Sequence, residues 1–143
     1  MSGINDQLQL KGHLQIHLND ELVRDVDNLV VTTGKNLVAS RLVGTTPAVM
    51  SHMAIGSGTT AAAAGNTALG TELGRVSLTS GSASSAVVTY VATFAAGTGT
   101  GAVTEAGLLN ASSGGTLLCR TVFSVVNKGA NDSMTVTWTV TVS

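Results

Sequence analysis

A chain of 143 residues, 43% of them hydrophobic, is long enough to form one domain with a substantial core. The formal net charge of −1 provides no overall field that would attract nucleic acid or an anionic membrane. The single cysteine, Cys119, excludes an internal disulfide, and no apolar run approaches the roughly 20 residues that a membrane helix needs. We therefore expect a single domain over residues 1–143, with neither nucleic acid nor a membrane as a partner.

The charged residues are unevenly distributed. Residues 1–44 hold nine of the fifteen charges, whereas residues 45–104 contain only Glu72 and Arg75. So many small, uncharged residues are compatible with low-complexity disorder. The well-patterned strands favour a different interpretation, in which an ordered surface meets other protein copies instead of water. Our candidates for this contact surface are Thr59, Ala62 and Thr98.

The first part of the chain predicts two strands joined by a tight turn. Apolar and polar residues alternate over residues 7–18, and Gly12 occupies the apolar register. This pattern predicts a half-buried strand that is kinked or bulged at Gly12, within an N-terminal strand or arm over residues 1–20. Asn19 and Asp20 predict the turn into a second strand.

One short helix is expected after the second strand. Residues 35–42 have a helical pattern of apolar residues, and Thr33 is positioned to cap the helix. The residues expected on its inner face are Leu37, Ala39, Leu42 and Val43.

Glycine and other small residues divide the middle of the chain. An apolar run over residues 49–55 ends at Gly56. Residues 56–74, with four consecutive alanines at 61–64, predict a loop or an extended arm. A Ser/Gly stretch over residues 80–85 and a Gly/Thr stretch over residues 97–101 predict further loops. Strands are expected between these loops, over residues 75–78, 87–94 and 102–109.

The last eleven residues give the clearest strand pattern in the chain, because apolar residues alternate strictly with four threonines. Residues 116–126 form a second strand-like run, and the polar segment 127–132 separates the two. A short loop with glycine and asparagine between two such runs predicts a β-hairpin. We expect Trp138 from the last strand and Phe94 to share one core with Leu117 or Leu118.

Seven or eight strands connected mostly by turns, with one short helix, predict an all-β fold. An antiparallel β-sandwich or jelly roll fits this pattern best.

No set of residues indicates catalysis, a metal site or a cofactor. His13 and His17 lie four residues apart, but on a strand this separation is about 13 Å, too far to share one ion. The acidic residues between 20 and 28 lack the glycine and the terminal glutamate of a calcium loop. Residues 97–101 have the composition of a phosphate-binding loop but are followed by a strand. We therefore expect neither an enzyme nor a protein that binds a small molecule.

Glu105 is unusual because it lies within the apolar run of residues 102–109. A carboxylate in that position either faces solvent or is buried beside a cation. The candidate cations are Arg120, within a strand-like run, and Arg75, at the end of an earlier turn. We predict a structural ion pair, since no second acid and no nucleophile accompany Glu105.

Several local patterns together resemble a family of small structural proteins encoded by tailed bacteriophages and prophages. The similarity covers roughly residues 28–143. The segments that carry it are residues 28–34 (NLVVTTG), 53–58 (MAIGSG), 67–75 (TALGTELGR), 104–108 (TEAGL), 114–120 (GGTLLCR) and the pair Asp132-Ser133.

The resemblance implies a non-enzymatic virion component with a β-sandwich or jelly-roll fold. Within that group, a capsid cement (decoration) protein is favoured, which would bind the major capsid protein and sister copies of itself. Such a protein is made in the cytoplasm of the host bacterium and is found on the capsid surface. The alternative is a component of the tail, the tail fibre or the baseplate.

Overall fold

The computed structural model describes residues 8–44 and 48–143, which form nine strands and one α-helix. Residues 1–7 of the expected N-terminal arm lie outside the described part of the chain. In chain order the elements are β1 (Leu10–Leu18), β2 (Glu21–Val30), α1 (Thr32–Leu42), β3 (His52–Gly56), β4 (Glu72–Ser77), β5 (Ser80–Ser84), β6 (Val87–Phe94), β7 (Gly101–Leu109), β8 (Leu117–Lys128) and β9 (Met134–Val142).

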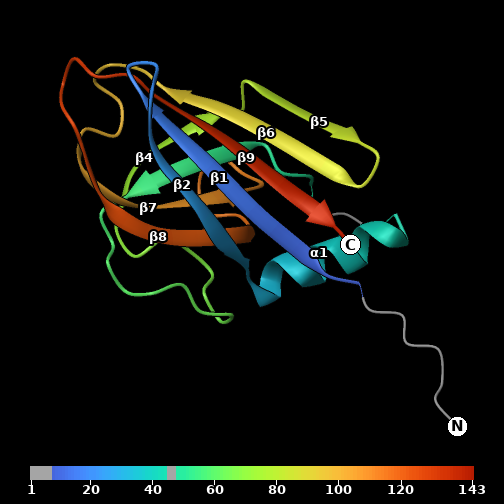
Figure 1. The fold of residues 1–143 in the computed structure, drawn as a ribbon. Coiled ribbons are helices and arrows are strands. Elements are labelled where there is room, and N and C mark those ends of the chain that lie inside the picture. The colour runs from blue at the N-terminus through green and yellow to red at the C-terminus, as the bar shows by residue number, and fades with distance from the viewer. Residues whose placement is uncertain (1–7, 45–47) are drawn as a thin grey trace, which may run out of the picture.

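All nine strands belong to one curled antiparallel sheet, which confirms the all-β class and the single short helix. The strand order is β4-β3-β7-β8-β2-β1-β9-β6-β5. In Figure 1, β2, β1, β9, β6 and β5 lie side by side as one layer, with β7 and β8 behind them. Hydrogen bonds connect every neighbouring pair of strands, so the nine strands form one continuous sheet. The more specific expectation of a sandwich or jelly roll, which has two separate sheets, is not established by this strand order.

The two halves of the sheet meet at β2. Up to Asn28, β2 pairs with β1, and from Leu29 it pairs with β8 over only two residue pairs, Leu29–Arg120 and Val30–Cys119. The sheet bends sharply where β2 changes its partner from β1 to β8, because β1 and β8 diverge and β2 cannot pair with both along its whole length. We call this change of partner the switch in β2. The helix α1 begins two residues after β2 ends.

The predicted hairpin between the last two long strands is wrong. β8 pairs with β7 and β2, whereas β9 pairs with β1 and β6. The turn after β8 therefore carries the chain from one half of the sheet to the other. Both edges of β9 are already occupied along its whole length, so β8 cannot pair with it. Loop length and composition alone do not reveal this competition for strand edges.

The expectation of seven or eight strands missed one strand. Ser80–Ser84 is the edge strand β5, which pairs with β6 although all five of its residues are small and exposed. Its pairing partner, and not its own composition, makes this Ser/Gly stretch a strand. The turn at Asn19 and Asp20 was predicted correctly: both residues have positive φ angles, of 49° and 69°. This is the backbone twist that a two-residue hairpin requires.

Gly12 does not kink β1, contrary to the prediction. It pairs regularly with Asn28 and Val140, and the register shift lies between Ile16 and His17 instead. A side chain at Gly12 would overlap the Asn28 amide, whose Oδ1 lies 1.6 Å from the position that a Cβ atom would take. Only glycine leaves enough space at this position for the Asn28 side chain.

The helix was predicted correctly, but the predicted cap, Thr33, is wrong, and of the predicted inner face only Leu37 is buried. Its N-terminal flanking residue is Val31, without a side-chain cap, while the Thr33 hydroxyl donates to the Leu117 carbonyl at 2.9 Å. Leu37 is buried as expected. Leu42 and Val43, however, are each 80% exposed, because the helix packs on β8 through a narrow face.

The core fills the space between the two halves of the sheet. Side chains from β1, β3, β6, β7, β8 and β9 form one buried cluster that contains both Trp138 and Phe94. Leu118 belongs to this cluster, and Leu117 belongs to a smaller one with Val31. The predicted association of the two aromatic residues with Leu118 is therefore confirmed. Trp138 Nε1 also donates to Asn28 Oδ1 at 3.0 Å.

We predict that Trp138→Ala lowers the free energy of unfolding by about 3–5 kcal/mol, because it leaves a large cavity between the half-sheets. The measurement is urea unfolding followed by circular dichroism. Val125→Ala is the control, since Val125 is 44% exposed, and it should change stability by less than about 1 kcal/mol. Similar losses in both variants would contradict this placement of Trp138.

Candidate functional site: a loop held by a buried ion pair

Two charged side chains are buried together beneath the long loop of residues 57–71. Glu105 on β7 is 0% exposed and Arg120 on β8 is 2% exposed. The Arg120 guanidinium lies 3.0 Å from Glu105 Oε1. Because β7 pairs with β8 and β3, Glu105 is held at the centre of its half-sheet, next to the end of β3 where the loop begins.

The Glu105 carboxylate binds both ends of this loop through backbone N–H groups. Oε2 accepts hydrogen bonds from the Gly58 amide at 2.6 Å and from the Thr71 amide at 2.8 Å. Oε1 accepts a further bond from the Gly70 amide at 2.8 Å. Thus one side chain joins the two ends of the 57–71 loop and satisfies amides that would otherwise be without partners.

The Arg120 guanidinium extends the same network further along the loop. It donates to Asn66 Oδ1 and to the Thr60 carbonyl oxygen, each at 3.0 Å. The loop also contacts the helix, since the Thr32 amide donates to the Ala64 carbonyl oxygen at 2.8 Å. The 57–71 loop is therefore fixed at its ends and along its length without any secondary structure of its own.

Glycine is required where the loop approaches the carboxylate. Cβ atoms at Gly56 and Gly58 would lie only 2.6 and 2.4 Å from Glu105 Oε2. Any larger residue at these two positions would displace either the carboxylate or the backbone. This explains the Gly-Ser-Gly sequence that ends β3.

The environment of Glu105 favours its charged form. Burial alone would raise the pKa of the Glu105 carboxyl. The amides of Thr71, Gly70 and Gly58, together with the Arg120 guanidinium, outweigh this effect and lower the pKa below its ordinary value. Glu105 therefore remains ionised, which makes it a structural acceptor and a poor proton donor.

Of the two arginines predicted as partners, the structure brings only Arg120 to Glu105. Arg75 lies on β4 and forms an ion pair with Glu72, with Nη2 2.7 Å from Oε1. Its Nη1 donates to the carbonyl oxygens of Ala111 and Gly114, both at 2.9 Å. Arg75 thus connects β4 to the turn between β7 and β8. Sequence spacing could not separate the two arginines, because the choice depends on which strand lies beside β7.

The three candidate contact residues do not share one loop. Thr59 is exposed and Ala62 is half-buried, and both belong to the 57–71 loop. Thr98 is half-buried in the loop between β6 and β7, where its methyl group lies 3.5 Å from the position of a Cβ atom at Gly74. Thr98 therefore packs against β4, which makes it a poorer contact residue than Thr59.

Two further polar clusters were not predicted from the sequence. Lys128 is 2% exposed, and its Nζ donates to the carbonyl oxygens of Ala95 and Asp132 at 3.0 and 2.7 Å. Burial lowers the pKa of this ammonium group, although Asp132 acts in the opposite direction. On the outer face of β1 and β2, His13 contacts Asp25 and Asp27, and the hydrogen bond that the His13 ring donates to Asp27 makes the largest contribution to raising the His13 pKa.

Within residues 8–44 and 48–143, no group of three or more His, Cys, Asp or Glu side chains is arranged to hold a metal ion. Cys119 is buried, and this burial raises the pKa of its thiol. No helix in the described part of the chain is long and apolar enough to span a membrane.

Comparison of the chain with protein-family models gives no matching family, and comparisons with curated proteins and with solved structures give no match either.

We predict that Glu105→Gln lowers the free energy of unfolding by about 3–5 kcal/mol, because it leaves the Arg120 charge buried without its counterion. For a chain of this size the loss corresponds to a fall in melting temperature of roughly 10 °C or more. The matched control is Glu72→Gln, which breaks the partly exposed pair with Arg75 and should cost only about 0–1 kcal/mol. Equal melting temperatures for the two variants would contradict the structural role of Glu105.

The lowered pKa of Glu105 also predicts how stability depends on pH. The folded pKa lies below the unfolded value, so the unfolded state takes up the proton first as the pH falls. The stabilisation is complete above about pH 5 and is lost as the pH falls towards the folded pKa. The wild-type protein should therefore lose more stability between pH 6 and pH 3 than Glu105→Gln, as measured by urea unfolding. Parallel losses in the two proteins would show that Glu105 titrates normally.

Proposed function

We propose that this protein is a structural component of a bacteriophage virion, and specifically a capsid cement protein. In this role it binds between subunits of the major capsid protein and associates with sister copies of itself. The 57–71 loop is the contact element, because it is ordered, exposed and entirely uncharged. Its function is mechanical, and no chemical step is assigned to it.

The observation that carries this proposal is the use of a buried ion pair to fix an exposed loop. Loops of this length without secondary structure are uncommon in compact domains and usually have a function. Ten of the fifteen loop residues are exposed, and none of them is charged. A loop that only connected β3 to β4 would not need five hydrogen bonds with buried charged groups, three to the Glu105 carboxylate and two from the Arg120 guanidinium. A loop that binds a partner gains affinity when it is ordered in advance.

The composition of the loop fits contact between protein copies. Small side chains permit close approach of two backbones, and uncharged residues lose little hydration energy when an interface closes. Many copies on a lattice can also combine modest individual contacts into stable binding. Several segments that resemble the phage family meet at this site, since they contain Gly58, Gly70, Glu105 and Arg120.

We predict that Thr59→Glu and Ala61→Lys fold normally but weaken binding to phage heads by about tenfold or more, because each buries an unpaired charge at the interface. The measurement is co-sedimentation of the purified protein with phage heads from the strain that carries the gene. The controls are Gln15→Lys and Ser124→Lys, which place a charge outside the loop and should bind like the wild-type protein.

Equal binding by all variants would show that the 57–71 loop is not the contact element. Absence of the wild-type protein from purified virions would refute the proposed role as a whole. Immunogold labelling of whole virions distinguishes the head from the tail, and labelling confined to the tail would replace the cement role with a tail role.

A further inference from the structure

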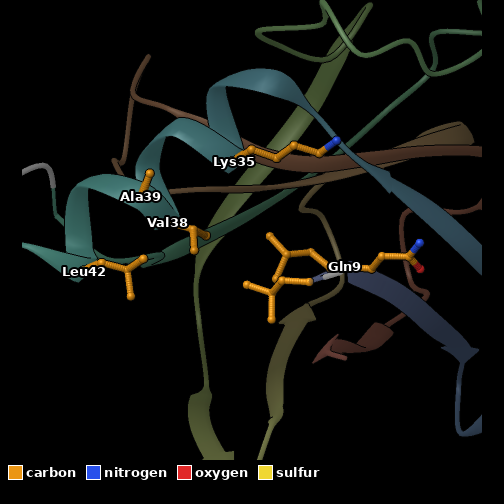
Figure 2. Close-up of a pocket in the computed structure, with 7 residues that line it drawn as sticks. Gln9, Lys35, Val38, Ala39 and Leu42 are labelled. Atoms are coloured by element: carbon orange, nitrogen blue, oxygen red, sulfur yellow. The ribbon is translucent and has the colours of Figure 1, made fainter. Parts of the chain in front are cut away.

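Two surfaces in the described part of the chain differ in what they offer a partner. A cavity of about 500 Å³ lies between the start of β1 and the helix α1, where Val38 and Leu42 face Gln9 across open space (Figure 2). β1 pairs with β9 from its first residue, so this cavity presents mainly side chains. The outer edge of β5 instead presents the backbone of a strand. Backbone N–H and C=O groups have fixed spacing and direction, so a strand edge specifies how a partner must lie.

The two edge strands of the sheet, β4 and β5, are protected to different degrees. β4 is half-buried and carries the ion pair of Glu72 and Arg75. All five residues of β5 are exposed, and none is charged or a proline. Its pairing with β6 is regular, without a bulge, and Figure 1 shows β5 at the outer margin of its layer. Charges, prolines, bulges and covering loops are the usual means by which an edge strand avoids pairing with another chain, and β5 has none of them.

The hairpin of β5 and β6 determines which backbone groups face outward. The Ala86 carbonyl oxygen accepts a hydrogen bond from the Val142 amide, next to β9, at 2.8 Å. Even-numbered residues of β6 therefore direct their backbone groups at β9, and odd-numbered residues direct theirs at β5. The three serines of β5 lie opposite odd-numbered residues of β6 and are hydrogen-bonded to that strand. Gly81 and Ala83 thus direct their N–H and C=O groups to the free edge.

The sequence of β5, Ser-Gly-Ser-Ala-Ser, is complementary to itself. When a second copy lies antiparallel to it across a two-fold axis at Ser82, Gly81 faces Ala83 of the second copy. Each of the two Gly–Ala pairs then exchanges two backbone hydrogen bonds. On the other face Ser80 meets Ser84 of the second copy, and serine hydroxyl groups can both donate and accept hydrogen bonds. No side chain in the strand is large enough to prevent this close approach.

The charge distribution also favours a second copy of the same chain. A two-fold axis places each residue near its own counterpart, so a charge close to the axis would repel itself. Residues 76–104, which include β5 and β6, contain no lysine, arginine, aspartate or glutamate. A charged segment of another protein would find no opposite charge on this edge, whereas β5 of a second copy is uncharged and of matching length.

We infer that β5 is a self-association edge, at which two copies of the chain pair antiparallel about Ser82 and join their sheets into one. The interface is small, so the isolated dimer is weak, and contacts on a lattice of copies add to it. The inference rests on the proposed association between sister copies, for which it names the strand. Self-association at β5 uses neither the 57–71 loop nor phage heads, so either property can fail while the other holds.

The first test is a disulfide bond across the two-fold axis. Ser82 and its counterpart form a non-hydrogen-bonded antiparallel pair, whose Cα atoms lie about 4.5 Å apart, within the range of a disulfide. Ser82→Cys should therefore form covalent dimers on mild oxidation of the purified protein, while the buried Cys119 does not compete. Ser124→Cys, at an exposed position of β8, is the matched control and should cross-link about tenfold more slowly or less. Equal rates for the two variants overturn the inference.

The second test places charges at the axis and measures the dimer by sedimentation equilibrium. The wild-type protein should dimerise at concentrations up to about 1 mM. Ser82→Lys and Ser82→Glu should each raise the dissociation constant about fivefold or more, because like charges then face each other. An equimolar mixture of the two variants should return to within about twofold of the wild-type value, since the facing charges are then opposite. Ser124→Lys is the control and should dimerise like the wild-type protein.

Each alternative result identifies what is wrong. A wild-type protein that stays monomeric at about 1 mM, or dimers that both Ser82 variants retain, overturns the inference. Weakened dimers in both variants that the mixture does not restore would overturn the antiparallel pairing about Ser82. Dimers that Thr59→Glu abolishes and Ser82→Lys leaves intact would place self-association on the 57–71 loop instead. Circular dichroism of every variant shows that a lost dimer is not a lost fold.

Discussion

The buried pair of Glu105 and Arg120 is the interaction on which the organisation of this molecule depends. A carboxylate and a guanidinium without access to water are destabilising unless each is fully hydrogen-bonded. Here the loop supplies the missing partners, three amides for Glu105 and two oxygens for Arg120. The dependence is mutual, because the ion pair holds the loop at both ends and at Thr60 and Asn66, and the loop supplies five of the hydrogen bonds of the ion pair. Loss of either should disorder the same fifteen residues.

The corner at β2 is the second constraint, and it acts through strand pairing. By leaving β1 at Asn28 and joining β8 at Leu29, β2 links two half-sheets and lets them close on one core. The same switch directs the chain into α1, which begins two residues after β2 ends. The corner therefore determines both how the core closes and where the helix lies.

The 57–71 loop is uncharged and fixed in advance, and these two properties support its proposed role as a contact element. Its order comes from the two buried charges beneath it, since the loop itself contains neither a helix nor a strand.

The sequence alone determined the features that depend on local pattern. Strict alternation predicted β1, β6 and β9, the turn-forming residues Asn19 and Asp20 predicted the first hairpin turn, and an acid within an apolar run singled out Glu105. Tertiary structure decided everything that depends on competition between distant segments. Ser80–Ser84 became a strand because β6 had a free edge, and β8 was excluded from β9 because β1 and β6 occupied both of its edges. Arg120 and not Arg75 reached Glu105 because β8, and not β4, lies beside β7. A strand edge or a buried charged group can form only a limited number of hydrogen bonds, so pairing with one segment excludes pairing with another. A local sequence pattern contains no information about which of the competing segments pairs.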